Sequence, residues 1–269
     1  MTAWHSLFIP STDQPAVVQA LQAALVELGY RPFNPFGLVP GKAYPRAVRL
    51  FVSPPRAGWV RVIGQPDERL LPRLSQLAPC LLVWLDGAEG DVQLYTDGQP
   101  ADPEALVEFL RPGRTEDDLK NALGRPTVSA ATTEPLPLDA LPDDVKALAR
   151  GVDMKHARRL FARLSGTTAR RSGASEDVAR QAQALIAAGS PPDWQSGSGR
   201  RLIEVLACLS IPDGWQRPDF TTLRDAYQVR ARLQQRPNAS LYPGDAEALE
   251  AVPDALDYTP VYAGAEAQA

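Results

Sequence analysis

The stretch Cys80-Leu81-Leu82-Val83-Trp84-Leu85 decides the fold, because its side chains are apolar on both faces of the strand that it predicts. We therefore predict a central strand at 80–85, inside a sheet with helices packed on it. Working outward, further runs of β-favouring and apolar residues predict neighbouring strands at 4–9, 46–52, 59–63 and 91–96.

Capping signals and apolar spacing predict helices between these strands. Ser11, Thr12 and Asp13 offer N-cap oxygens, Pro15 suits a first helical turn, and Gly29 can close the helix in a left-handed conformation. Thr115 and Asp118 have the spacing of a capping box. The resulting order of elements predicts an α+β domain over residues 1–123, with a mixed or antiparallel sheet. The helices are expected at 15–28, 66–77, 103–110 and 115–123.

The second half of the chain has a different pattern. Residues 124–140 are rich in proline, threonine and alanine and predict a linker. Beyond them the apolar spacing favours an all-α helical domain over 141–243, with Trp194 and Trp215 closing the ends of a small bundle. The helices are expected at 143–150, 153–164, 175–188, 200–209 and 222–236. Their core is expected to consist of Leu160, Phe161, Leu164, Leu185, Ile186, Leu202, Ile203, Leu206, Leu209, Leu223 and Tyr227.

Charge is divided unevenly along the chain. The net charge is −4, yet 141–243 holds 16 lysine and arginine residues against 10 acids, and 244–269 holds 6 acids and no base. The acidic segment 244–269 has little apolar content, so we expect a disordered tail that can bind the basic helix in cis. The basic residues that we expect to contact a partner or a nucleic acid are Lys155, Arg158, Arg159, Arg163, Arg170 and Arg171.

Two classes of function explain these cations. The leading hypothesis is a non-catalytic macromolecular interaction protein, of the adaptor or scaffold type, whose basic helical surface binds an acidic protein surface. The alternative is a nucleic-acid-binding protein, because 143–165 resembles a helix-turn-helix unit in the Ala147, Gly151 and Val152 spacing. Lys146 and Arg150 depart from that pattern, since they stand where the first helix would show apolar residues.

An enzyme with an unrecognised site is the third hypothesis, because the residues give little material for catalysis. The two histidines, His5 and His156, and the two cysteines, Cys80 and Cys208, lie far apart in sequence. We therefore expect no catalytic residue that can be named, no metal site and no cofactor. A turn that could bind an anion at a helix N-terminus is predicted at Gly197, Gly199, Arg200 and Arg201.

The compartment is inferred from the cysteines and from hydropathy. Two isolated cysteines in apolar runs suit buried free thiols in a reducing environment. The longest apolar run, 77–85, is too short to cross a bilayer. We expect a cytoplasmic protein without a membrane partner.

Overall fold

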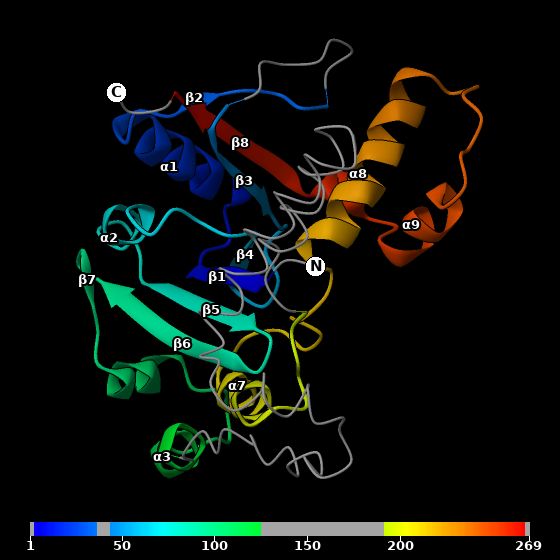
Figure 1. The fold of residues 1–269 in the computed structure, drawn as a ribbon. Helices are drawn as coiled ribbons and strands as arrows, with labels where there is room; N and C mark the ends of the chain where they lie inside the picture. Colours follow the sequence, from blue (N-terminus) through cyan, green and yellow to red (C-terminus); the bar gives the residue numbers. More distant parts are fainter. Residues whose placement is uncertain (1–2, 37–43, 125–190, 267–269) are drawn as a thin grey trace, which may run out of the picture.

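The computed structural model describes residues 3–36, 44–124 and 191–266. Its strands form one eight-stranded sheet in the order β2-β8-β3-β4-β1-β5-β6-β7, and every neighbouring pair is antiparallel (Figure 1). The strands are β1 (Trp4–Pro10), β2 (Arg31–Pro32), β3 (Arg46–Val52), β4 (Trp59–Ile63), β5 (Cys80–Asp86), β6 (Glu89–Thr96), β7 (Gln99–Pro100) and β8 (Thr259–Ala265). The helices are α1 (Gln14–Glu27), α2 (Leu70–Leu74), α3 (Glu116–Gly124), α7 (Gly197–Cys208), α8 (Phe220–Gln235) and α9 (Asp245–Ala251), with 3-10 helices η1 (Pro103–Phe109) and η3 (Ala255–Asp257).

The centre of the sheet is built from two interleaved crossovers. Helix α1 connects β1 to β3, which run parallel with β4 between them, and α2 connects β4 to β5 with β1 between them. This is the split βαβ arrangement, in which each crossover skips one strand. The predicted α+β character of the N-terminal half is confirmed, and the sheet is antiparallel. The strand predicted at 80–85 lies inside the sheet, between β1 and β6.

Helices α1 and α2 cover one face of the sheet. Of the three predicted N-cap candidates, Asp13 is the one that caps α1, where its Oδ1 accepts a hydrogen bond from the Ala16 amide at 2.9 Å. Alternate residues of the strands point to these helices, so the core on this face is aliphatic. It includes Leu7, Ile9, Leu21, Leu25, Leu50, Val60, Val62, Leu70 and Val261.

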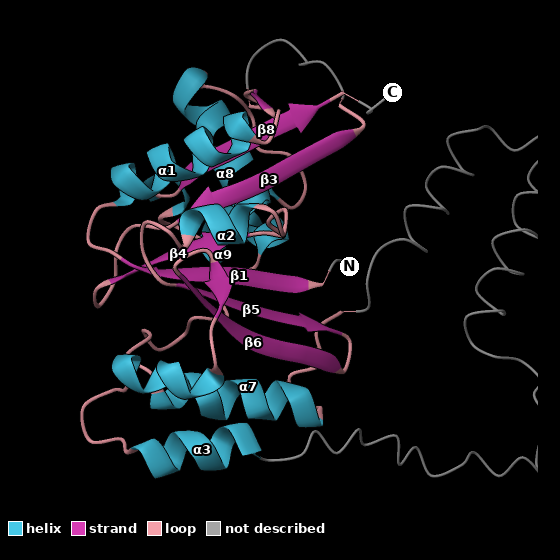
Figure 2. Ribbon diagram, turned by 90° about the vertical axis from the view of Figure 1, so that its left-hand side faces the viewer, coloured by secondary structure: helices cyan, strands magenta, loops and turns pink. Residues whose placement is uncertain are grey.

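The opposite face carries two separate clusters. Helices α7 and α3 pack with η1 on the β5 and β6 side, whereas α8 packs with α9 and η3 beside β3 and β8 (Figures 1 and 2). Leu202 of α7 shares its cluster with Trp4 of β1, and Leu223 of α8 shares the other cluster with Phe51 of β3. The described part of the predicted helical domain is therefore not a separate bundle, because its apolar stripes are buried on the sheet.

Trp194 and Trp215 illustrate this correction. Their ring centroids each lie 5.3 Å from that of Trp4, and 5.4 Å from one another, in edge-on geometry. Such aromatic pairs contribute stability beyond their buried area. The two indoles therefore join the 191–243 segment to β1 rather than closing a bundle.

The segment 244–269, predicted as a disordered acidic tail, is folded up to residue 266. It forms α9 and β8, and β8 lies between β2 and β3 with Val261, Tyr262 and Ala263 buried. The acids are also engaged, since Asp245 accepts hydrogen bonds from Arg232 and from the Tyr242 amide. The expectation was wrong because the average composition of the segment conceals one short apolar strand, which gains stability only from its two neighbours.

Caps explain where the later helices begin. Ser196 caps α7 by accepting from the Gly199 amide at 3.0 Å, and Asp219 caps α8 by accepting from the Thr222 amide at 2.9 Å. Both helices therefore begin earlier than predicted. The capping box of α3 is confirmed, because Thr115 and Asp118 exchange side-chain and backbone hydrogen bonds. No helix in the described part of the chain is long and apolar enough to cross a membrane.

Candidate binding groove

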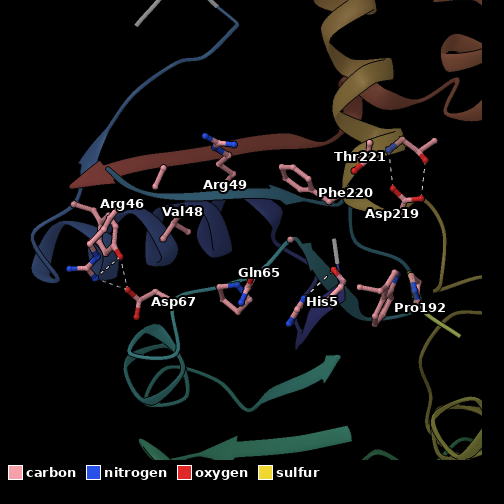
Figure 3. A pocket seen from close by; sticks show the side chains of 17 residues that line it. His5, Arg46, Val48, Arg49, Gln65, Asp67, Pro192, Asp219, Phe220 and Thr221 are labelled. Carbon is pink, nitrogen blue, oxygen red and sulfur yellow. Dashed lines mark hydrogen bonds and ion pairs between the residues drawn. The ribbon is translucent and has the colours of Figure 1, made fainter. Parts of the chain in front are cut away.

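The sheet splits at one end and leaves a groove of about 790 Å³ (Figure 3). Strands β3 and β4 pair only at Phe51 with Ile63 and at Val52 with Val62, so the first half of β3 has no partner on that side. The chain leaves β4 at Gly64, whose φ is +119° and where a Cβ atom would stand 2.5 Å from the Arg49 carbonyl oxygen. Glycine therefore permits both the turn and the close approach.

The edge of β3 in this groove presents unpaired backbone donors. The Ser53 amide donates to the Arg61 carbonyl, so odd-numbered residues of β3 turn their backbone groups toward β4. Tyr262 of β8 lies opposite Arg49. The Tyr262 carbonyl accepts a hydrogen bond from the Phe33 amide, on the side away from β3, which fits the same alternation. The amides of Ala47 and Arg49 therefore face the groove, where no described strand pairs with them.

One wall of the groove holds a tight ionic network. Asp67 accepts from Arg69 at 2.7 Å and from the Tyr30 hydroxyl at 2.6 Å. Arg46 lies 3.5 Å from the Asp67 carboxylate (Figure 3). The hydrogen bonds from Arg69, followed by the one from Tyr30, hold the pKa of Asp67 well below its usual range. Two arginines share this one carboxylate, so the network keeps one positive charge in excess.

The other wall comes from the start of α8. Asp219 lines the groove, but its carboxylate accepts from both the amide and the hydroxyl of Thr222. Arg49 is exposed and forms no ion pair with a described carboxylate. His5 of β1 also lines the groove. Burial lowers the pKa of its imidazole below the ordinary value of 6.5, so the ring is neutral at pH 7. Of the groove residues Asp219, Arg49 and His5, Arg49 of β3 is therefore the one whose charge is exposed and not taken up by an ion pair or a cap.

The residues predicted to bind a partner or a nucleic acid are not part of this groove. Lys155, Arg158, Arg159, Arg163, Arg170 and Arg171 lie outside the described residues, as does the segment 143–165 that resembles a helix-turn-helix unit.

The predicted anion-binding turn is the first part of α7 itself. Gly199 is buried and its amide is taken by Ser196, and Arg201 is paired with Asp91 at 2.7 Å. Arg200 remains exposed. Anion binding there stays a prediction, with one amide and one arginine already engaged.

The thiols do not form a nucleophilic site. Cys80 and Cys208 are free and buried, and burial raises the pKa of Cys80 to about 12 and raises that of Cys208 as well. A thiol is a nucleophile only as the thiolate, so both side chains serve packing at neutral pH. In residues 3–36, 44–124 and 191–266, no cluster of three or more His, Cys, Asp or Glu side chains could hold a metal ion.

No protein-family model, curated protein or solved structure matches this chain. The function is therefore argued from the geometry and charge of the groove. Sequence reasoning missed this site because its walls come from segments as distant as His5, Arg49, Asp67 and Phe220. The one local signal was the Gly64-Gln65-Pro66-Asp67 turn directly after a strand.

Proposed function

We propose that this chain is a non-catalytic interaction protein that binds an acidic, extended segment of a partner protein in the groove beside β3. The observation that carries the proposal is the open edge of β3, where the amides of Ala47 and Arg49 face the groove and the Arg49 guanidinium stands exposed. Extended segments bind such edges through backbone hydrogen bonds, and neighbouring side chains supply specificity.

The state of the acids supports binding rather than catalysis. Asp67 is held ionised by arginines, and Asp219 is used as a helix cap. A general acid or base needs a pKa near the working pH and a free lone pair or proton. An acidic ligand instead meets Arg46, Arg49 and two unpaired amides, which are all donors.

The basic segment extends the same proposal. Lys155, Arg159 and Arg163 would form, on a predicted helix, a second surface that binds an acidic partner. The protein would act in the cytoplasm, because both cysteines are free thiols. The competing outcome of the test is nucleic-acid binding by the whole set of cations, Lys155, Arg158, Arg159, Arg163, Arg170 and Arg171.

The test measures fluorescence anisotropy of labelled eight-residue peptides, Val-Glu repeats and Val-Lys repeats, with the full chain at low and physiological salt. Arg49→Glu should weaken binding of the acidic peptide at least tenfold, because a charged hydrogen bond is worth about 1.5–3 kcal/mol. Ala47→Pro should also weaken it, since it removes the groove-facing amide without removing a bond to β8. Arg31→Glu, an exposed arginine of β2, is the matched control.

Two results would contradict the proposal. Equal affinity for the acidic and basic peptides would mean that charge plays no part. Equal losses in Arg49→Glu and Arg31→Glu would mean that the groove plays no part. A labelled oligothymidine that binds more tightly than the acidic peptide, with affinity falling steeply as salt rises, would favour the nucleic-acid alternative.

A further inference from the structure

The sheet protects the outer edge of β6 with charged side chains. β6 pairs with the short strand β7 only over its last two residues. The Ala101 amide donates to the Leu94 carbonyl, so even-numbered residues of β6 turn their backbone groups toward this edge. The Val92 amide donates to the carboxylate of Asp91 at 2.8 Å, and Arg201 pairs with that carboxylate at 2.7 Å. Charged groups on an open edge prevent another strand from pairing there.

The edge of β3 in the groove has no such cover among the described residues. The amides of Ala47 and Arg49 face the groove, and no described strand or side chain accepts from them. The nearest charged side chains on β3 are the arginines at 46 and 49, which are themselves donors. An edge that is open and surrounded by donors fits an extended ligand that supplies acceptors.

The groove is short, because structure bounds it at both ends. At one end Gly64 lies so close to the Arg49 carbonyl that a Cβ atom has no space. At the other end Arg46 reaches from β3 to Asp67 at 3.5 Å and to the Tyr30 hydroxyl at 3.1 Å (Figure 3). The two open amides are two residues apart, roughly 7 Å along a strand, so about three ligand residues can pair with β3. A chain that ends in the groove avoids the arginine bridge, whereas one that continues has to cross it.

Arg46 has donors to spare at that end. Both of its contacts use Nη2, and its Nε and Nη1 form no hydrogen bond with a described residue. The side chain lines the groove and is 38% exposed. Hydrogen bonds from a guanidinium to a carboxylate are charge-assisted and stronger than neutral ones.

We propose that the groove takes the free carboxyl end of a partner chain, rather than an internal segment; this inference rests on the proposed function. Every neighbouring pair in the sheet is antiparallel, and a ligand antiparallel to β3 runs toward Arg46. Its last residue then lies opposite Ala47. One carboxylate oxygen accepts from the Ala47 amide, where an internal residue would offer its carbonyl, and the other accepts from Arg46.

The same register sets the two preceding ligand residues. Directly opposite residues of antiparallel strands have their side chains on the same face. The residue before the last lies beside Val48, which is buried and apolar, and the one before that lies beside the exposed Arg49. The preferred ending is therefore an acid, an apolar residue and a last residue with a free carboxylate.

The experiment measures anisotropy of N-terminally labelled peptides with the full chain. The peptide Gly-Ser-Gly-Ser-Glu-Val-Ala is compared as the free acid and as the C-terminal amide, and a third peptide carries Lys in place of Glu. The free acid should bind about tenfold more tightly than the amide, because the amide lacks the charge that Arg46 meets. The Lys peptide should bind more weakly than the Glu peptide.

Variants assign the difference to Arg46. Arg46→Gln should abolish the preference for the free acid over the amide. Arg73→Gln, at an arginine of similar exposure that pairs with Glu27, should leave the preference unchanged. Urea unfolding shows whether each variant folds, and the comparison of acid with amide needs no variant.

The outcomes separate this inference from the proposed function. Equal affinity of the free acid and the amide, or a preference that Arg46→Gln leaves intact, overturns the carboxyl-end proposal. If the Glu peptide still binds more tightly than the Lys peptide in that case, the proposed function stands. Absence of binding by every peptide overturns both.

Discussion

Removal of β8, the last strand among the described residues, should prevent folding. A chain that ends at Tyr258 loses the strand that lies between β2 and β3. The remaining β3 would then have no neighbour on that side, and its other side is already open along Ala47 and Arg49.

The magnitude follows from what β8 buries. Val261, Tyr262 and Ala263 are each at most 6% exposed, and burying three such side chains stabilises the fold by about 5 kcal/mol. The ladder with β3 runs from Arg46 to Val52, and its roughly six hydrogen bonds contribute about 5 kcal/mol more. The sum is about as large as the whole stability of an ordinary domain, 5–15 kcal/mol.

The assay compares the full chain with the chain that ends at Tyr258, by near-ultraviolet circular dichroism and urea unfolding. The shorter chain should show no fixed aromatic signal and no cooperative transition. If the shorter chain unfolds cooperatively at the same urea concentration as the full chain, the reasoning is refuted, and residues 259–269 contribute no stability, as expected for a disordered tail. Val261→Ala should cost about 2 kcal/mol, and Val26→Ala, at a side chain that is 55% exposed, should change stability by less than about 0.5 kcal/mol.

Three further changes test the packing and the titration. Gly199→Ala should destabilise by about 1–3 kcal/mol because its Cβ would stand 2.5 Å from the Asp193 carbonyl oxygen. Gly124→Ala, whose Cβ would meet no atom of the described residues within 4 Å, should be neutral or stabilising in urea unfolding. Leu202→Ala should cost about 2–5 kcal/mol, with tryptophan fluorescence and circular dichroism changing together; two separate transitions would contradict the shared core. Burial lowers the pKa of His5, so below its ordinary value of 6.5 the unfolded state binds the proton better, and the free energy of unfolding should fall as pH falls. His5→Gln should flatten this dependence between pH 6.5 and 5, and an unchanged slope would rule out His5 as its source.

Local sequence patterns predicted the secondary structure correctly wherever a short segment specifies its own structure. The apolar run at 80–85, an N-cap within 11–13 and the capping box at Thr115 and Asp118 each depend on residues within a few positions, and each was predicted correctly. The order of elements in the first half follows from such signals, and that order fixed the α+β class.

The amino-acid sequence by itself thus determined the longer strands of the first half, but not the two-residue strands β2 and β7, and it determined the helices α7 and α8 of the second half. Only the tertiary structure decided that α7 and α8 pack on the sheet, because an apolar stripe states that a helix is buried but not what buries it. It also decided that β8 pairs beside β3, since a short strand is stable only with its neighbours. The tertiary structure also decided the groove, because it arises where distant segments meet and leave donors without partners among the described residues.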